Sequence, residues 1–97
     1  MRVITMALPQ SSIEDVLCSR VRLKILKVLM QSDELNVSEI ARKIGVNYAS
    51  TKMHLEALEK EGVLTHVMFG KRIRYYRFQE SARARAVKAF IEAWHAP

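Results

Sequence analysis

The sequence predicts one mainly α-helical domain that carries a single β-hairpin. Apolar residues recur at helical spacing in several segments between residues 13 and 95. The stretch 63–78 is instead rich in β-branched and aromatic residues and is interrupted by a Gly-Lys-Arg tip, as a hairpin is. With 97 residues the chain has room for one domain and a modest core.

Two helices are predicted before residue 31. Ser12, with Asp15 three residues later, forms a capping box and opens a short helix at Ile13, so residues 1–11 are an N-terminal extension of the domain at 12–97. A scaffold helix from Ser19 to Met30 is crowded with apolar residues on one side and carries arginine and lysine residues on the other. The polar segment 31–35 is predicted to be a loop.

A second capping box opens the next helix. Asn36 and Glu39 have the required spacing, the helix runs through Ile44, and Gly45 is the residue type expected just after a helix end.

The helix that follows begins after a tight turn, with Asn47 as its cap and Glu61-Gly62 as its stop. Thr51, Leu55 and Leu58 recur at i, i+4 and i+7 and are predicted to face the core. Two helices joined by a short glycine-containing turn form a helix-turn-helix, here at 36–61.

The remainder is the hairpin at 63–78 and a last helix at 80–95. Because successive strand residues point to opposite faces, one of Tyr75 and Tyr76 is expected to be buried and the other more exposed. A hairpin that directly follows a helix-turn-helix is a wing, so the fold class is a winged helix-turn-helix with outer helices at both ends.

Positive charge is concentrated beyond residue 41. The formal net charge is +6, and residues 1–41 are neutral, with five bases and five acids. Between Lys71 and Lys88 the sequence has seven arginine or lysine residues and one acidic residue. Such a one-sided field suits a polyanion, although a solvated cationic face that serves solubility is the alternative interpretation.

The outward side of the second helix of the motif can enter a DNA major groove, and the wing can reach the neighbouring backbone or minor groove. Base contacts are expected near the helix N-terminus, with Lys52 as the best candidate for guanine or, alternatively, for phosphate. Phosphate contacts are expected from the wing and from the preceding helix. The predicted DNA-binding residues are Arg42, Lys43, Asn47, Tyr48, Ala49, Ser50, Lys52, Met53, Lys71, Arg72 and Arg74.

Four runs resemble the ArsR-type winged helix-turn-helix regulators: Ser-Arg-Val-Arg-Leu-Lys-Ile-Leu, Val-Ser-Glu-Ile-Ala-Arg-Lys-Ile-Gly-Val, His-Leu-Glu-Ala-Leu-Glu-Lys-Glu-Gly-Val-Leu and Gly-Lys-Arg-Ile-Arg-Tyr-Tyr-Arg. The resemblance covers roughly residues 19–78. It implies that 47–53 begin the recognition helix, that 70–72 are the wing tip, and that the N- and C-terminal helices are dimerisation helices. A sequence-specific transcriptional regulator of double-stranded DNA, acting as a dimeric repressor, is the function expected.

The last helix carries a large apolar face that either folds back on its own domain or meets a second copy of the chain. We expect a homodimer with the first helix contributing, which predicts a pseudo-palindromic DNA site. The predicted interface residues are Ile13, Val16, Leu17, Val87, Phe90, Ile91 and Trp94.

No metal and no other cofactor is expected. Members of the family that sense metals use a cysteine pair or His and acidic ligands, and the resemblance places Asn36 and Ser38 at the cysteine positions. Glu92 and His95 offer only two ligands near a helix end. Cys18 is expected to be a buried small apolar residue rather than a redox sensor.

No enzyme is predicted, because His54 lacks a nucleophile, paired acid or phosphate loop and is expected to pack or to form a hydrogen bond. A single cysteine and the lack of a membrane-length apolar run favour the cytoplasm. Two alternatives stay open at this stage. One is an architectural, chromatin-like DNA-binding protein with little sequence preference, and the other is a winged-helix module for protein–protein assembly.

Overall fold

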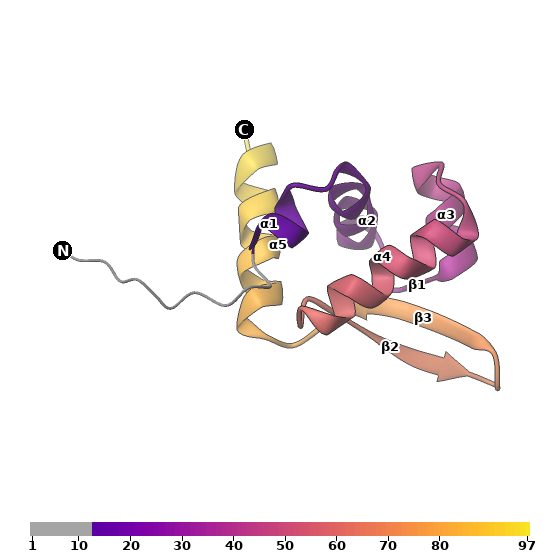
Figure 1. Cartoon of the computed structure of the whole chain (residues 1–97). Coiled ribbons are helices and arrows are strands. Elements are labelled where there is room, and N and C mark those ends of the chain that lie inside the picture. The colour runs from indigo at the N-terminus through magenta and orange to yellow at the C-terminus, as the bar shows by residue number, and fades with distance from the viewer. Residues whose placement is uncertain (1–12) are drawn as a thin grey trace.

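The computed structural model describes residues 13–97, so the predicted extension at 1–11 and the Ser12 cap lie outside the described part. The prediction of a mainly α-helical fold with one hairpin is confirmed (Figure 1). In chain order the elements are α1 (Ile13–Leu17), α2 (Arg20–Gln31), β1 (Leu35–Asn36), α3 (Val37–Ile44), α4 (Tyr48–Lys60), β2 (Leu64–Phe69), β3 (Ile73–Phe78) and α5 (Ala82–His95).

The helix starts are fixed by side-chain caps. Asn36 Oδ1 accepts the Glu39 amide at 2.8 Å, and Glu39 Oε1 accepts the Asn36 amide at 2.9 Å, which completes the predicted capping box of α3. Asn47 Oδ1 accepts the Ser50 amide at 2.8 Å at the start of α4. These bonds satisfy amides that have no partner within the helix, so the N-terminus of α4 is held in one place.

The loop predicted at 31–35 is wrong at both ends, because Gln31 is the last residue of α2 and Leu35 and Asn36 form strand β1. Leu35 pairs with Tyr76 and Asn36 with Tyr75, which gives an antiparallel sheet in the order β1-β3-β2. A two-residue strand is too short to show alternation in the sequence, so only its pairing with β3 identifies it. The strand attaches the wing to the start of α3.

The hairpin closes as predicted. Phe69 pairs with Ile73 across a tip whose Gly70 has φ of 66°, a backbone conformation that favours glycine. Tyr76 is fully buried and Tyr75 is half-buried, as the alternation predicts. Tyr75 packs on Phe69 with ring centroids 4.6 Å apart. The outer half of the wing therefore has its own small aromatic contact.

One core joins the helices to the sheet. Leu55 and Leu58 of α4 are fully buried, and Thr51 is buried with its hydroxyl donating to the Val46 carbonyl at 3.4 Å, so the predicted inner face of α4 is confirmed. Burial of this face leaves the opposite side of α4 directed outward. The buried apolar cluster comprises Val16, Ile25, Leu26, Leu29, Leu35, Val37, Ile40, Ile44, Leu55, Leu58, Val63, Leu64, Tyr76 and Ile91.

No helix within residues 13–97 has both the length and the apolar character needed to cross a bilayer.

Candidate nucleic-acid interface

The N-terminal half of α4 presents the side chains that a recognition helix needs. Tyr48 is 53% exposed and Met53 is 57% exposed, and Ala49 is exposed between them. Ser50 and Lys52 are half-buried. The positive end of the helix dipole lies at the same end, so a phosphate there is favoured as well.

The wing meets this end of α4. Tyr48 lines a small hollow together with Arg72, Ile73 and Arg74 of the wing and with the 36–38 segment at the start of α3. Lys71 and Arg72 are exposed at the tip. The fold thus brings the predicted base-reading end of α4 and the predicted phosphate contacts of the wing onto one surface, which we call the DNA-facing surface (Tyr48–Met53 and Lys71–Arg74).

Arg74 is held by two partners. Its Nη1 donates to the Tyr76 hydroxyl at 3.1 Å and to Glu56 Oε2 at 3.2 Å. The hydrogen bond with Tyr76 raises the pKa of Arg74 above its ordinary value, with a smaller contribution from Glu56. Burial raises the pKa of Tyr76, and Arg74 partly opposes this rise. Tyr76 therefore stays a neutral phenol, and Arg74 stays a cation with a fixed direction.

Glu56 also lies 4.0 Å from Lys52 Nζ, one turn earlier on α4. One carboxylate is therefore shared by a predicted base contact and a predicted wing contact. Sequence reasoning missed Glu56 as a member of the site. The i, i+4 spacing of Lys52 and Glu56 was a visible signal, but the partner on β3 was not.

Two predicted phosphate contacts lie elsewhere. Arg42 and Lys43 are exposed in the last turn of α3. Lys43 lines a separate hollow between α2 and α3 with Lys24 and Lys27. Positive charge on α3 is therefore joined by positive charge on α2. From the sequence, the lysines of α2 are interpreted only as the polar side of a scaffold helix.

The recognition helix is also tied to α2 and, through it, to α1. Arg22 of α2 donates from Nε to His54 Nδ1 at 3.0 Å and from Nη1 to the Asp15 carbonyl at 2.6 Å. Burial, and then the Arg22 charge, lower the pKa of His54. The prediction that His54 packs or forms a hydrogen bond is confirmed, since its neutral ring accepts a bond from a cation that also holds α1.

The predicted dimer-interface residues divide into two groups in the protomer. Val16 and Ile91 are buried in its own core, and Leu17 and Val87 pack against that core. Ile13, Phe90 and Trp94 are exposed, with Trp94 at 75%. We call these three exposed side chains the outer apolar face, although Ile13 lines a different hollow, with Val87, from the one lined by Phe90 and Trp94. An interface here would therefore be formed mainly by these three side chains, with the other four as support.

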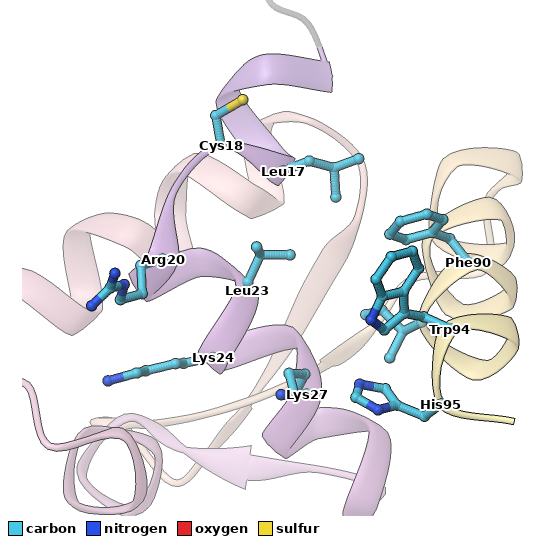
Figure 2. Close-up of a pocket in the computed structure, with 10 residues that line it drawn as sticks. Leu17, Cys18, Arg20, Leu23, Lys24, Lys27, Phe90, Trp94 and His95 are labelled. Carbon is cyan, nitrogen blue, oxygen red and sulfur yellow. The ribbon is translucent and has the colours of Figure 1, made fainter. Parts of the chain in front are cut away.

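A groove separates α5 from α1 and α2. Phe90 and Trp94 project from α5 toward Leu17 and Leu23, whereas Arg20 and Lys24 point away from the rings (Figure 2). Cys18 also lines this groove and is exposed, so the prediction that it is buried is wrong. It directly follows the last residue of α1, where the chain leaves the helix, and it is exposed among the described residues 13–97.

Within residues 13–97 no three His, Cys, Asp or Glu side chains are grouped so that they could hold a metal ion. Asn36 is engaged in the α3 cap, and Glu92 and His95 are exposed on α5. The expectation that no metal is bound stays a prediction.

Residues 19–66 match the model of a family described as "Bacterial regulatory protein, arsR family". Two curated relatives, the cadmium resistance transcriptional regulatory proteins CadC of Listeria innocua and Lactococcus lactis, are each 39% identical over 61 residues. Those residues are 63% of this chain and 51% of each relative, so the chain spans about half the length of the relatives that it matches.

Solved structures agree with the fold. A possible transcriptional regulatory protein from Mycobacterium bovis is 26% identical with a TM-score of 0.68, covering 82% of this chain and 83% of its own. The transcriptional repressor BigR from Xylella fastidiosa is also 26% identical with a TM-score of 0.68, covering 84% and 82%. A homodimeric winged helix-turn-helix domain from Mycobacterium bovis, 24% identical with a TM-score of 0.69, covers 91% and 89%.

Proposed function

This chain belongs to the ArsR family of winged helix-turn-helix regulators, and from that premise we propose that it is a homodimeric repressor that binds specific sequences in double-stranded DNA. The observation that carries the proposal is the position of α4. Its inner face is locked into the core by Leu55 and Leu58, and its outer N-terminal half lies beside a cationic wing. A rigid helix with free polar side chains next to fixed positive charge can both read bases and position itself on the backbone.

The exposed residues have distinct roles in this proposal. Lys71 and Arg72 at the wing tip, with Arg42 and Lys43 on α3, contact phosphates. Tyr48, Ala49, Ser50 and Met53 meet base edges, where the apolar side chains can contact thymine methyl groups. Lys52 is the candidate for guanine, because it lies in the N-terminal half of α4 and its ammonium group can donate to the O6 and N7 acceptors of guanine.

Dimerisation is proposed through the outer apolar face. Ile13, Phe90 and Trp94 are exposed large apolar side chains of α1 and α5, and exposed aromatic side chains such as the Phe90–Trp94 pair are typical of interfaces. A structural neighbour with the same fold is described as homodimeric, which supports this assignment. Two-fold symmetry would place the two recognition helices about 34–36 Å apart, in successive major grooves.

The family is regulatory rather than enzymatic, and we extend this to the present chain by proposing that it has no catalytic activity and no cofactor. The name of the CadC relatives refers to cadmium resistance. We do not extend a metal response to this chain, because Asn36 and Ser38 offer no thiolate on α3. The DNA target makes the cytoplasm the proposed location.

Selection of DNA sequences tests the proposal. The purified protein is incubated with a random-sequence duplex pool at physiological salt, and the retained DNA is sequenced. A pseudo-palindromic motif is expected, and it should disappear in a Tyr48→Ala, Lys52→Ala double variant that keeps the caps and the core of α4.

Other outcomes would contradict the proposal in distinguishable ways. Retention of DNA without a motif would identify an architectural protein with little sequence preference. Absence of retention would indicate a winged-helix assembly module, whose groove-facing residues would then tolerate substitution. A single half-site motif would preserve sequence-specific binding but contradict the dimer.

A further inference from the structure

We propose that Glu56 is a specificity-determining residue, which restrains Lys52 and Arg74 and so weakens binding to random DNA more than binding to the specific site. The inference rests on the proposed DNA-binding function and names a residue that sets its selectivity. Glu56 places a negative charge within a surface whose other charged side chains are positive and suit a polyanion such as DNA.

The geometry places one carboxylate between cations from two elements. Glu56 Oε2 lies 3.2 Å from Arg74 Nη1 on β3 and 4.0 Å from Lys52 Nζ on α4. Its side chain is 50% exposed, so it shares the surface that would face DNA. A phosphate that approaches either cation therefore also approaches the carboxylate, and like charges repel.

Arg74 is further held from the side of the core. Its Nη1 donates to the hydroxyl of Tyr76 at 3.1 Å, and the Tyr76 residue is fully buried. The guanidinium therefore lies between a rigid anchor and a carboxylate. Lys71 and Arg72 at the wing tip differ, since no ion pair is formed by either within residues 13–97.

The DNA-facing surface therefore contains two kinds of cation. The free pair at the wing tip can follow any phosphate backbone and supplies affinity for every sequence. Lys52 and Arg74 are held in fixed directions by Glu56, and its negative charge partly neutralises them. They therefore contribute less affinity to a complex in which the protein contacts only the phosphate backbone. At the specific site Lys52 and Arg74 are needed in their fixed positions, and releasing them brings little gain there.

The test compares Glu56→Gln with wild-type protein and with Glu59→Gln. Glu59 lies on the same helix, and its substitution by glutamine removes the same negative charge. Its carboxylate lies 2.9 Å from His66 Nδ1 and forms no ion pair with Lys52 or Arg74 within residues 13–97. Equilibrium affinity is measured for a random duplex and for the selected motif, at several salt concentrations.

For Glu56→Gln we expect affinity for the random duplex to rise about fivefold to tenfold, because two cations become free to contact phosphate. Affinity for the motif should change by less than about twofold, so the ratio of specific to non-specific binding falls. Glu59→Gln should raise random-duplex affinity by about twofold or less, through net charge alone.

Equal effects of the two variants on both duplexes would overturn the proposal, since only net charge would then matter. An unchanged random-duplex affinity in Glu56→Gln would also overturn it. Thermal unfolding should be unchanged in Glu56→Gln, because ion pairs of a half-exposed carboxylate contribute little to stability. Glu59→Gln keeps an acceptor for the part-buried contact with His66, and its thermal unfolding is measured alongside to show that it is folded.

A double-mutant cycle identifies the partner. In an Arg74→Ala background the effect of Glu56→Gln on random-duplex affinity should shrink at least twofold, and additivity of the two changes would contradict the proposed restraint. If wild-type protein binds no duplex at all, the proposed function and this inference both fail. If wild-type binds its motif and Glu56→Gln keeps the same specificity ratio, only the role of Glu56 fails.

Discussion

The two ends of the molecule complete their packing to different degrees. Helix α3 buries four of its eight residues and is fixed by a capping box, whereas α5 buries only Ala84 and Ile91 among its fourteen. Figure 1 places α5 at one end and the wing tip at the other. The helices α3 and α4 are fixed by their own caps and core contacts, while within residues 13–97 the aromatic side chains Phe90 and Trp94 of α5 are left exposed.

The exposed apolar side chains at the two ends differ as well. On α4, Tyr48 and Met53 are separated by smaller and polar residues, as suits a surface that meets base edges and phosphates in turn. On α5, Phe90 and Trp94 lie together, with ring centroids 6.1 Å apart. The wing also has a ring pair, Phe69 with Tyr75, but that pair joins the two strands of one hairpin. Two exposed rings side by side on one terminal helix favour a protein partner.

The largest expected effect comes from a Phe90→Glu, Trp94→Glu double variant. Two carboxylates at the centre of an apolar interface should weaken the dimer by about a hundredfold or more, since aromatic residues dominate such interfaces. Both residues are more than half exposed in the protomer, so the fold should remain. Sedimentation would show a monomer, and circular dichroism would show wild-type helix content.

Arg85→Glu serves as the control, because it adds acidic charge at an exposed position of the same helix. It should leave the dimer intact. A wild-type protein that sediments as a folded monomer would contradict the contrast between the two ends.

A smaller effect is expected from a Lys71→Ala, Arg72→Ala variant of the wing tip. The slope of log affinity against log salt should flatten by about 0.9 for each phosphate contact removed, and affinity should fall alike for all sequences. The oligomeric state should not change, because the tip lies at the far end from α5 (Figure 1). Fluorescence anisotropy titrations across a salt series would measure this.

The matched control is Arg85→Ala, Lys88→Ala, which removes the same charge from α5. If this variant flattens the salt slope as much as the wing variant does, the wing has no special role in phosphate contact.

The smallest expected effect concerns His54 of α4, which Arg22 of α2 links to α1. Burial and the Arg22 charge lower the pKa of His54 in the folded protein from its ordinary value of 6.5. Between the two pKa values the unfolded chain binds more protons, so stability rises with pH. The stabilising contribution is complete above the ordinary pKa and is lost as pH falls through the lowered one.

Urea unfolding of wild-type protein and of His54→Gln from pH 7.5 to pH 5 would isolate this contribution, since glutamine keeps an acceptor for Arg22 but does not titrate. The wild-type free energy of unfolding should fall more steeply toward low pH. Parallel curves would show that His54 does not link pH to stability.

The interactions that the sequence predicted correctly are local ones. The caps at Asn36 and Asn47, the apolar spacing of Thr51, Leu55 and Leu58, and the glycine at the wing tip each depend on residues a few positions apart. A cap or a helical face requires only spacing and residue type, so it can be read without knowing what packs against it. The predicted DNA contacts follow from the same local geometry. They remain predictions, which the variants described above would test.

The sequence by itself determined the order of the elements, the outward side of α4 and the cationic character of the wing, because helical and strand periodicities are fixed within a few residues. Tertiary structure alone decided the pairing of β1 with β3, the sharing of Glu56 by Lys52 and Arg74, the bridge from Arg22 to His54, and the exposure of Cys18. Except for the i, i+4 pair of Lys52 and Glu56, these features depend on segments that are distant in the chain or on what covers a side chain. No local periodicity encodes which distant partner will be adjacent, since that is settled by how the helices and the sheet pack on a common core.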